Sequence, residues 1–252
     1  MLEQAHGKSV LRADELRAMN LLLLRDEDFA PDGTARLRGR RLVHAREVLR
    51  VEAGDTVRAG RLRGLVGTAT VLSQSDAELV LQPALTEAPP PRPGVDLILA
   101  LPRPKALRKV LPAVASLGIG RLVLVNAARV EKSFFQSAVL DELTDRLCEG
   151  LEQARDTVPP EVLLRERLRP FVEDELPALF PSGARLLAHP GGARLAGAAA
   201  APCVLAIGPE GGWVPFELAL FAGRGFTEVS AGPRILRVEV AVPYLLGMIC
   251  AS

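Results

Sequence analysis

The chain has 252 residues, of which 48% are hydrophobic, 24% charged and 4% aromatic. This is the composition of a soluble globular protein, and it excludes a disordered chain, a collagen and a membrane protein. The 31 basic and 30 acidic residues give a formal net charge of +1. No global field therefore draws the protein to nucleic acid, and any basic surface must be local.

The cysteines give no sign of a disulfide framework or a metal site. Cys148, Cys203 and Cys250 are widely spaced, with no Cys-x-x-Cys pair and no histidine cluster nearby. No charged segment leads into an apolar run with a cleavage site, and the leucines at 21–24 form a run far too short to span a bilayer. We therefore expect a cytoplasmic protein with no bound metal and no membrane partner.

The first part of the chain has the short apolar pieces that form strands. Residues 1–18 are polar and precede an internal Met19, so we treat them as an extension without an assigned fold. Between residues 19 and 88, apolar pieces at 55–57, 65–72 and 77–82 are separated by turn residues, which favours a small β-barrel. A helix is expected at 41–50, where Leu42, Ala45 and Leu49 recur at helical spacing.

An arginine-rich stretch stands out in this nearly neutral chain. Residues 36–63 contain nine arginines and only three acids, Glu47, Glu52 and Asp55, which gives a local charge of +6 (9 − 3). Arg46 and Arg50 would lie on successive turns of one helix face. The excess fits contacts to phosphates, and it fits a solvated helix face equally well.

A proline-rich linker at residues 87–94 separates this part from a segment with a different pattern of apolar residues. From residue 92 to 252, continuous apolar strands alternate with helices. This pattern favours an α/β domain with a mostly parallel sheet covered on both faces. The expected strands are 95–101, 121–125, 161–164, 185–188, 203–207 and 227–230, and the first two expected helices are 106–117 and 140–151.

Three loops after expected strands are candidates for a ligand site, because open parallel sheets bind ligands beyond the carboxyl ends of their strands. They are His-Pro-Gly-Gly at 189–192, Gly-Pro-Glu-Gly-Gly-Trp at 208–213 and Ala-Gly-Pro-Arg-Ile-Leu-Arg at 231–237. Their glycines let backbone N–H groups approach a nucleotide-like molecule. Neither a dinucleotide fingerprint nor a phosphate loop is present. Trp213 could stack on a base or anchor the following helix.

The second and third loops together resemble a known family. Residues 207–212 (Ile-Gly-Pro-Glu-Gly-Gly), followed by 232–239 (Gly-Pro-Arg-Ile-Leu-Arg-Val-Glu), are similar to the paired C-terminal motifs of the 16S rRNA uridine-N3 methyltransferases, a branch of the SPOUT superfamily. Residues 41–50 with 54–55, 99–102 and 152–153 also match, so the resemblance covers about 19–252. It implies a PUA-like β-barrel that binds RNA, at 19–88, and a SPOUT α/β domain with a C-terminal trefoil knot, at 92–252. It also implies S-adenosylmethionine as cofactor, ribosomal RNA as partner and a homodimer.

The resemblance and the loop chemistry together assign three groups of residues. Arg237 would stabilise charge that develops on the target ring, and Glu239 would accept the N3 proton or orient Arg237. Alternatively, these two residues merely pair at a helix start. The expected cofactor-binding residues are Leu187, His189, Gly208, Pro209, Glu210, Gly211, Gly212, Ala231, Gly232, Ile235 and Leu236, and the expected RNA-binding residues are Arg40, Arg41, Arg46, Arg50, Arg155 and Arg234.

The chain departs from the family pattern in segments around the predicted site. The family's Leu-Arg-Thr-Glu-Thr-Ala becomes Leu-Arg-Val-Glu-Val-Ala at 236–241, which replaces two hydroxyls with the methyls of Val238 and Val240. Its Lys-Ala-Thr-Glu-Leu-Gly becomes Ala-Val-Ala-Ser-Leu-Gly at 113–118, and its Glu-Gln-Ser-Gly-Arg is matched only by Glu-Gln-Ala-Arg at 152–155. Three alternatives therefore stay open: a non-catalytic RNA-binding or assembly protein with the same fold, a methyltransferase with another RNA target, and another nucleotide-binding α/β enzyme.

Overall fold

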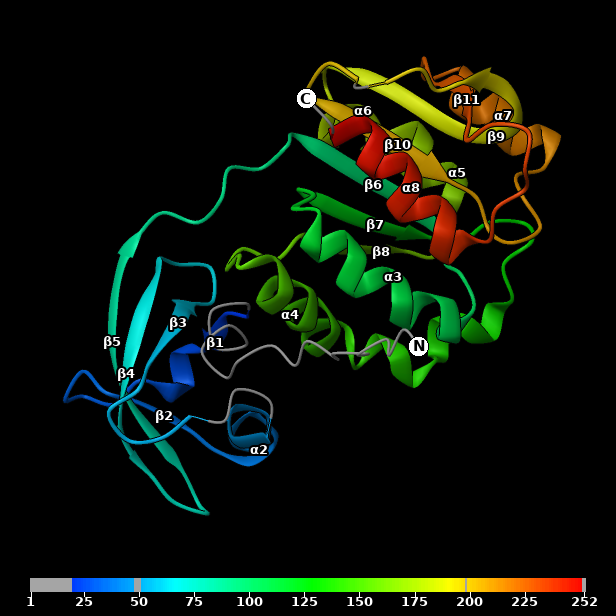
Figure 1. Ribbon diagram of the computed structural model, residues 1–252. Helices are drawn as coiled ribbons and strands as arrows, with labels where there is room; N and C mark the ends of the chain where they lie inside the picture. The colour runs from blue at the N-terminus through cyan, green and yellow to red at the C-terminus, as the bar shows by residue number, and fades with distance from the viewer. Residues whose placement is uncertain (1–19, 48–50, 198, 251–252) are drawn as a thin grey trace, which may run out of the picture. The chain divides into compact units, whose positions relative to one another are not determined.

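The computed structural model describes residues 20–47, 51–197 and 199–250 (Figure 1). Contacts divide the chain into an N-terminal unit, Met1–Pro89 with Arg155–Thr157, and a C-terminal unit, Pro90–Ala154 with Val158–Ser252. The boundary between Pro89 and Pro90 falls within the proline-rich stretch. The extension at 1–18 and the end of the predicted helix at 48–50 lie outside the described residues.

The N-terminal unit is built on a five-stranded, curled sheet that forms a half-barrel. The strand order is β1-β3-β4-β5-β2, with β1 parallel to β3 and the other pairs antiparallel. Helix α2 (Gly39–Glu47) and the short 3-10 helix η1 (Asp26–Asp28) lie between strands in the chain. The strands are β1 (Leu22–Leu24), β2 (Ala35–Leu37), β3 (Thr56–Arg61), β4 (Val66–Gln74) and β5 (Leu79–Glu87).

Alternating side chains fill this half-barrel. In β4, Ala69 and Val71 are buried while Thr68 and Thr70 are exposed, as expected for a strand with one face on the core. Gly67 makes room for the neighbouring strand, because a Cβ there would lie 2.2 Å from the carbonyl oxygen of Ala84. The short strands β1 and β2 were not among the strands predicted from the sequence.

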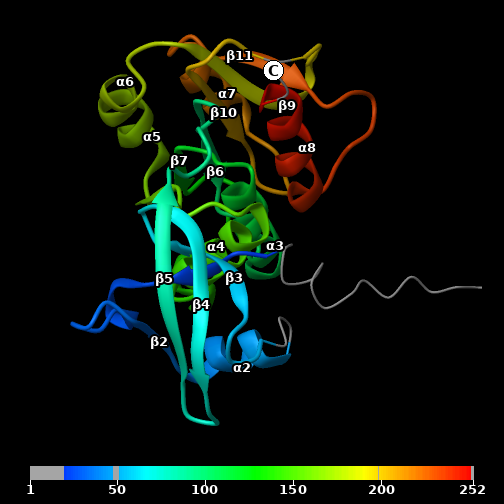
Figure 2. The same cartoon turned by 60° about the vertical axis from the view of Figure 1, so that its left-hand side comes forward.

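The C-terminal unit is a six-stranded, all-parallel sheet covered on both faces, as predicted. Helices α3, α4 and α8 lie on one face and α5, α6 and α7 on the other (Figures 1 and 2). The strands are β6 (Val95–Ala100), β7 (Arg121–Val125), β8 (Glu161–Arg165), β9 (Ala184–Arg194), β10 (Cys203–Ile207) and β11 (Thr227–Ser230). The helices are α3 (Pro104–Ser116), α4 (Leu143–Ala154), α5 (Leu168–Pro170), α6 (Leu176–Leu179), α7 (Pro215–Ala222) and α8 (Val238–Cys250), with the π-helical turn η4 (Phe171–Glu175) between α5 and α6.

In the C-terminal unit, two predicted elements have clearly different bounds in the structure. The helix expected at 140–151 begins only at Leu143, because the preceding residues form the 3-10 helices η2 (Lys132–Gln136) and η3 (Ala138–Leu140). The strand expected at 185–188 extends to Arg194, so the segment at 189–192 that we predicted as a loop is part of β9. The extension arises because β11 pairs with Leu187 and then, after a register shift, with Ala193 and Arg194.

The strand order β11-β9-β10-β6-β7-β8 reverses direction between β6 and β10. From β6 the chain adds β7 and β8 on one side, whereas β10, β9 and β11 lie on the other. Connections that leave neighbouring strands in opposite directions open a crevice at the carboxyl edge of the sheet. After β11 the chain returns to α8, which packs on α3, β6 and β10. The resemblance assigns the trefoil knot to this C-terminal region.

Close packing of α3 against α4 depends on a glycine. A Cβ on Gly150 would lie 2.1 Å from the carbonyl oxygen of Pro112 in α3, and Ser116 donates a hydrogen bond of 2.9 Å to the Gly150 carbonyl. Outside this contact, hydrogen bonds from Arg108 and Arg146 lower the pKa of Glu142 to about 2. The two helices therefore meet backbone to backbone at Gly150.

We predict that Gly150→Ala destabilises the C-terminal unit by about 2 kcal/mol, because the methyl group forces α3 and α4 apart. Urea unfolding followed by the fluorescence of Trp213, the only tryptophan of the chain, measures this change. Glu149→Ala is the control: its side chain is exposed and bound to Arg146, so its loss should cost less than about 1 kcal/mol. Equal stability of the two variants would contradict the close contact.

Candidate active site

The candidate site lies at the carboxyl edge of the parallel sheet, where the strand order reverses. The loop after β10 is tied to the loops that follow β6 and β7. The Glu210 carboxylate accepts a hydrogen bond of 3.1 Å from the Arg103 N–H, and the Arg129 guanidinium donates to the Gly211 carbonyl. Residues 208–212 are thus held across the reversal by the two loops on its other side.

Glu217 is a structural residue of this region that the sequence analysis missed. Its carboxylate is buried and accepts hydrogen bonds from the N–H groups of Ala128, at 2.7 Å, and Val214, at 2.9 Å. It closes the first turn of α7 and joins that turn to the loop after β7. Pro215 at the first helical position with a glutamate two residues later was the sequence signal for such a cap.

Trp213 anchors α7 in the core. Its side chain is buried, and its ring lies 5.1 Å from that of Phe221, centroid to centroid. A Cβ on Gly208 would lie 3.2 Å from the indole ring, so the glycine lets the loop fold over it. The structure therefore favours the anchor over a base-stacking role for Trp213.

The predicted cofactor-binding residues come from three adjacent strands. Leu187 of β9 is buried and pairs with Ala206 of β10 on one side and Glu228 of β11 on the other. His189 follows within β9, and its Nδ1 lies 3.1 Å from the Glu228 carboxylate and accepts a hydrogen bond of 3.2 Å from Gly191. Segments 187–189, 208–212 and 231–236 therefore share one edge of the sheet.

The loop after β11 presents unpaired backbone donors. Gly232 has φ +110° and Gly212 in the neighbouring loop has φ +72°, both in the region that favours glycine. The N–H groups of Gly232, Arg234 and Ile235 donate to no acceptor in the described part of the chain. Ile235 is 89% exposed, and Leu236 is half-buried. The loop can therefore supply both hydrogen bonds and apolar contact to a ligand.

Arg237 and Glu239 stand at the start of α8. The Arg237 carbonyl accepts from the N–H groups of Val240 and Ala241, and Glu239 lies in the first turn. No ion pair joins the two side chains, and within the described residues the Arg237 guanidinium has no carboxylate partner. Val238 is buried at 4% exposure, whereas Val240 is 48% exposed.

The predicted RNA-binding arginines fall into different environments. Arg41 binds the buried carboxylate of Asp28 with both terminal nitrogens, and Arg46 lies 2.9 Å from Asp76. The side chain of Arg40 and all of Arg50 lie outside the described residues. Arg155 has φ +57° just after α4, and Arg234 is exposed in the loop before α8. Arg41 and Arg46 of α2 are thus each bound to a carboxylate of the N-terminal unit.

The described residues contain neither a metal-binding cluster nor a membrane-spanning helix. No group of three or more His, Cys, Asp or Glu side chains is arranged to hold a metal ion. No described helix has the length and apolar character needed to cross a membrane.

Comparison with known proteins identifies the family. A model of the RNA methyltransferase domain matches residues 89–250. The ribosomal RNA small subunit methyltransferase E of Treponema pallidum is 31% identical over 247 residues, which cover 93% of this chain and 91% of the relative. The proteins of that name from Mycobacterium bovis and Mycobacterium tuberculosis are each 29% identical over 172 residues, 64% of this chain and of theirs.

Solved structures confirm the predicted fold. A putative methyltransferase of Legionella pneumophila, in complex with S-adenosylmethionine, superposes with a TM-score of 0.77 at 22% identity, covering 93% of this chain and 97% of that one. The small subunit methyltransferase E of Neisseria gonorrhoeae, bound to the same molecule, gives 0.71 at 21% identity over 89% and 94%. The half-barrel and parallel sheet are thus the PUA-like and SPOUT parts that the resemblance implied. The domain model matches more than half of this chain, and the Treponema pallidum relative matches nearly all of it. The chain therefore belongs to the family of RNA methyltransferases that includes ribosomal RNA small subunit methyltransferase E.

Proposed function

We propose that this protein transfers a methyl group from S-adenosylmethionine to N3 of a uridine in small-subunit (16S) ribosomal RNA. Family membership supports the reaction class, and the relatives' names point to the small subunit. The observation that carries the proposal is the pair of glycine-containing loops, 208–212 and 231–236, at the edge where the strand order reverses.

The residues present fit the cofactor. Gly212 and Gly232 adopt positive φ with open space where a Cβ would project, so the backbone can lie close to a ligand. Free N–H groups in the loop after β11 can donate to the polar atoms of a nucleoside, while Leu187, Ile235 and Leu236 supply apolar surface. The neighbours that contain S-adenosylmethionine share this fold. Their sequence identity is low, so they support the fold, and the residue assignments rest on the loops themselves.

Positioning and electrostatics supply the chemistry. The cofactor offers a methyl group on a positively charged sulfur, which any well-placed nucleophile can take without a metal or a covalent enzyme intermediate. Uridine N3 carries a proton that must leave before or as the N–C bond forms, and the resulting negative charge spreads over the ring oxygens. Arg237, free of carboxylate partners in the described structure, can stabilise that charge. Glu239, in the first turn of α8, can accept the proton or orient Arg237.

The hydroxyl-to-methyl replacements at Val238 and Val240 favour a second candidate, a non-catalytic RNA-binding protein with the same fold. Val238 is part of the core, where it replaces a polar group with an apolar one. The loops for the cofactor are nevertheless complete, and a non-catalytic protein would have no use for them. A methyl-transfer assay on small ribosomal subunits and on purified 16S RNA separates the two candidates.

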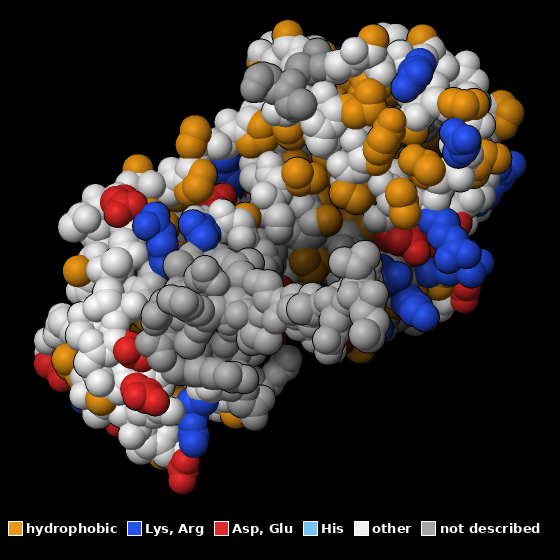
Figure 3. Space-filling view, viewed as in Figure 1, with side chains coloured by type: hydrophobic (Ala, Val, Ile, Leu, Met, Phe, Trp, Pro, Cys, Tyr) orange, Lys and Arg blue, Asp and Glu red, His pale blue; other side chains and the backbone are white. Residues whose placement is uncertain are grey.

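We further infer that two copies associate and work in the cytoplasm. Figure 3 shows hydrophobic side chains gathered on the face of the C-terminal unit that carries α8. Ile235, Val240 and Tyr244 contribute exposed fractions of 89%, 48% and 42%. An apolar face of this kind usually meets another protein surface. Sedimentation of the protein as a single chain at micromolar concentration would contradict the dimer. No disulfide joins the three cysteines in the described part of the chain, as expected in a reducing compartment.

Replacing Gly232 tests the cofactor loop. We predict that Gly232→Val weakens S-adenosylmethionine binding at least tenfold, about 1.4 kcal/mol, because the side chain forces φ out of the region near +110° and fills the space beside the loop. Isothermal titration calorimetry measures the affinity. Gly225→Val is the matched control, since Gly225 also has positive φ and open surroundings but lies in the turn before β11. An equal loss in both variants would point to general strain instead of a cofactor contact.

Replacing Arg237 tests the chemical step. If its guanidinium stabilises charge mainly in the transition state, Arg237→Ala should bind S-adenosylmethionine normally and lose about a hundredfold in single-turnover rate at saturating RNA. Arg169→Ala, which removes an exposed arginine paired with Glu173, should leave the rate unchanged. A wild-type rate in folded Arg237→Ala would remove this residue from the mechanism. No turnover by the wild type on any ribosomal RNA would support the non-catalytic candidate.

A further inference from the structure

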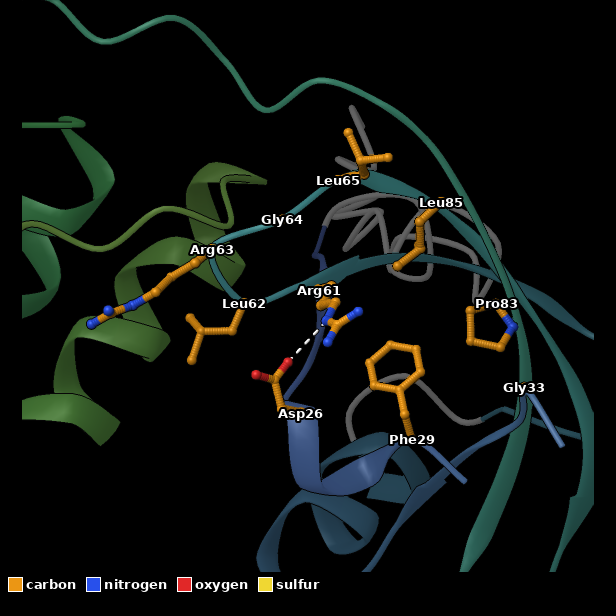
Figure 4. Close-up of a pocket in the computed structure, with 10 residues that line it drawn as sticks. All are labelled: Asp26, Phe29, Gly33, Arg61, Leu62, Arg63, Gly64, Leu65, Pro83 and Leu85. Carbon is orange, nitrogen blue, oxygen red and sulfur yellow. Dashed lines mark hydrogen bonds and ion pairs between the residues drawn. The ribbon is translucent and has the colours of Figure 1, made fainter. Parts of the chain in front are cut away.

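The N-terminal unit contains a pocket of 610 Å³ that no part of the methyl-transfer mechanism uses (Figure 4). Its volume lies within the range of small-molecule sites, about 300–1,000 Å³. The β3–β4 turn forms one side, and η1 and β5 form others. The lining residues are Asp26, Phe29, Gly33, Arg61, Leu62, Arg63, Gly64, Leu65, Pro83 and Leu85.

Part of the wall is a cation–π contact between Arg61 and Phe29, called here the Arg61–Phe29 stack. The Arg61 guanidinium lies over the Phe29 ring, 5.0 Å from its centroid, and Arg61 Nε donates a hydrogen bond of 2.8 Å to Asp26 (Figure 4). The Arg61 side chain remains 51% exposed, so the stack is accessible. Leu65, at 46% exposure, adds apolar surface beside it. Unpaired RNA bases are commonly bound by stacking on aromatic rings and on arginine planes.

Arg63 lines the pocket in a strained backbone conformation, and its side chain extends away from Arg61 and Phe29 (Figure 4). Its φ is +62°, in the left-handed region that side chains other than Gly, Asn and Asp rarely adopt. Three hydrogen bonds hold the turn: Gly64 N–H to the Arg61 carbonyl at 2.8 Å, Arg63 N–H to the Thr157 carbonyl at 2.7 Å, and Thr157 Oγ1 to the Gly64 carbonyl at 2.5 Å. Strain that the surroundings enforce in this way often marks a functional position.

Arg63 also differs from the other arginines of the basic stretch. Within the described residues its side chain has no hydrogen bond or ion pair, whereas six other arginines of the stretch have carboxylate partners. Those partners all come from outside residues 36–63. The pairs are Arg36 and Arg38 with Glu78, Arg41 with Asp28, Arg46 with Asp76, Arg58 with Glu87, and Arg61 with Asp26.

We propose that this pocket binds one unpaired nucleotide of the RNA. The base lies against the Arg61–Phe29 stack and Leu65, and Arg63 holds a phosphate. The pocket's single uncompensated charge is positive, as a phosphate ligand requires. This inference rests on the proposed function only in taking RNA as the partner. It places the RNA contact of the N-terminal unit at the β3–β4 turn, whereas Arg41 and Arg46 of α2 are bound to acids.

Arg63→Asn tests the phosphate contact without disturbing the fold, because asparagine tolerates positive φ. The full-length protein is titrated into a fluorescent single-stranded RNA and, separately, into a duplex of the same sequence. We expect the variant to bind the single strand about tenfold more weakly, with a salt slope reduced by about 0.7, the share of one phosphate. Arg169→Asn removes an exposed, carboxylate-bound arginine of the C-terminal unit and should change affinity less than twofold.

Leu65→Glu is the second variant, since it adds a negative charge to an exposed pocket residue and should weaken single-strand binding as much. An unchanged affinity for the single strand in both pocket variants would overturn the proposal. It would also be overturned if the duplex bound as tightly as the single strand and its binding were weakened as much by the substitutions. The affinity of both variants for S-adenosylmethionine should be that of the wild type. If the wild type binds single-stranded RNA through Arg63 but transfers no methyl group, the proposed function is contradicted and the pocket proposal is supported.

Discussion

The reversal of strand order between β6 and β10 is the constraint on which the rest of the C-terminal unit depends. All six strands are parallel, so every carboxyl end lies at one edge, and the reversal separates the loops after the two central strands. The structure then ties these loops together with few contacts. Glu210 reaches the Arg103 N–H, Arg129 reaches the Gly211 carbonyl, and Glu217 joins α7 to the loop after β7. The parallel sheet and these contacts together set the positions of the candidate cofactor loops.

Much of the fold could be predicted from the sequence because its signals are local. Runs of buried residues such as 95–100 and 203–207 can only be central strands of a covered sheet, and the prolines at 89–93 cannot continue either element. The length of β9 could not be predicted, because it depends on β11, which pairs again with Ala193 and Arg194 after a bulge. Strands β1 and β2 are three residues each, too short to show a period.

In the candidate site too, features set by the local sequence could be predicted and features set by distant partners could not. The glycines at 208, 211, 212 and 232 could be singled out because glycines that follow buried strands let the backbone approach a ligand, and their contact with the cofactor stays a prediction. Glu217 was missed, although its place after Pro215 indicated a helix cap, because its second partner, Ala128, lies far away in the chain. The pairing of the arginine-rich stretch could not be predicted for a related reason. A local charge count does not include carboxylates such as Glu78, which lies just before β5 and meets Arg36 and Arg38.

The turn that carries Arg63 is completed by residues that come much later in the chain. Arg155–Thr157 follow α4 of the methyltransferase part, yet they belong to the N-terminal unit, where Thr157 both accepts from Arg63 and donates to Gly64. During synthesis, the first unit therefore cannot finish its β3–β4 turn until the chain has grown past residue 157, with β6, α3, β7 and α4 already made. Folding of the N-terminal unit is thereby linked to the synthesis of the parallel sheet, and a cut at Pro89 would leave the N-terminal half without the three residues that complete it.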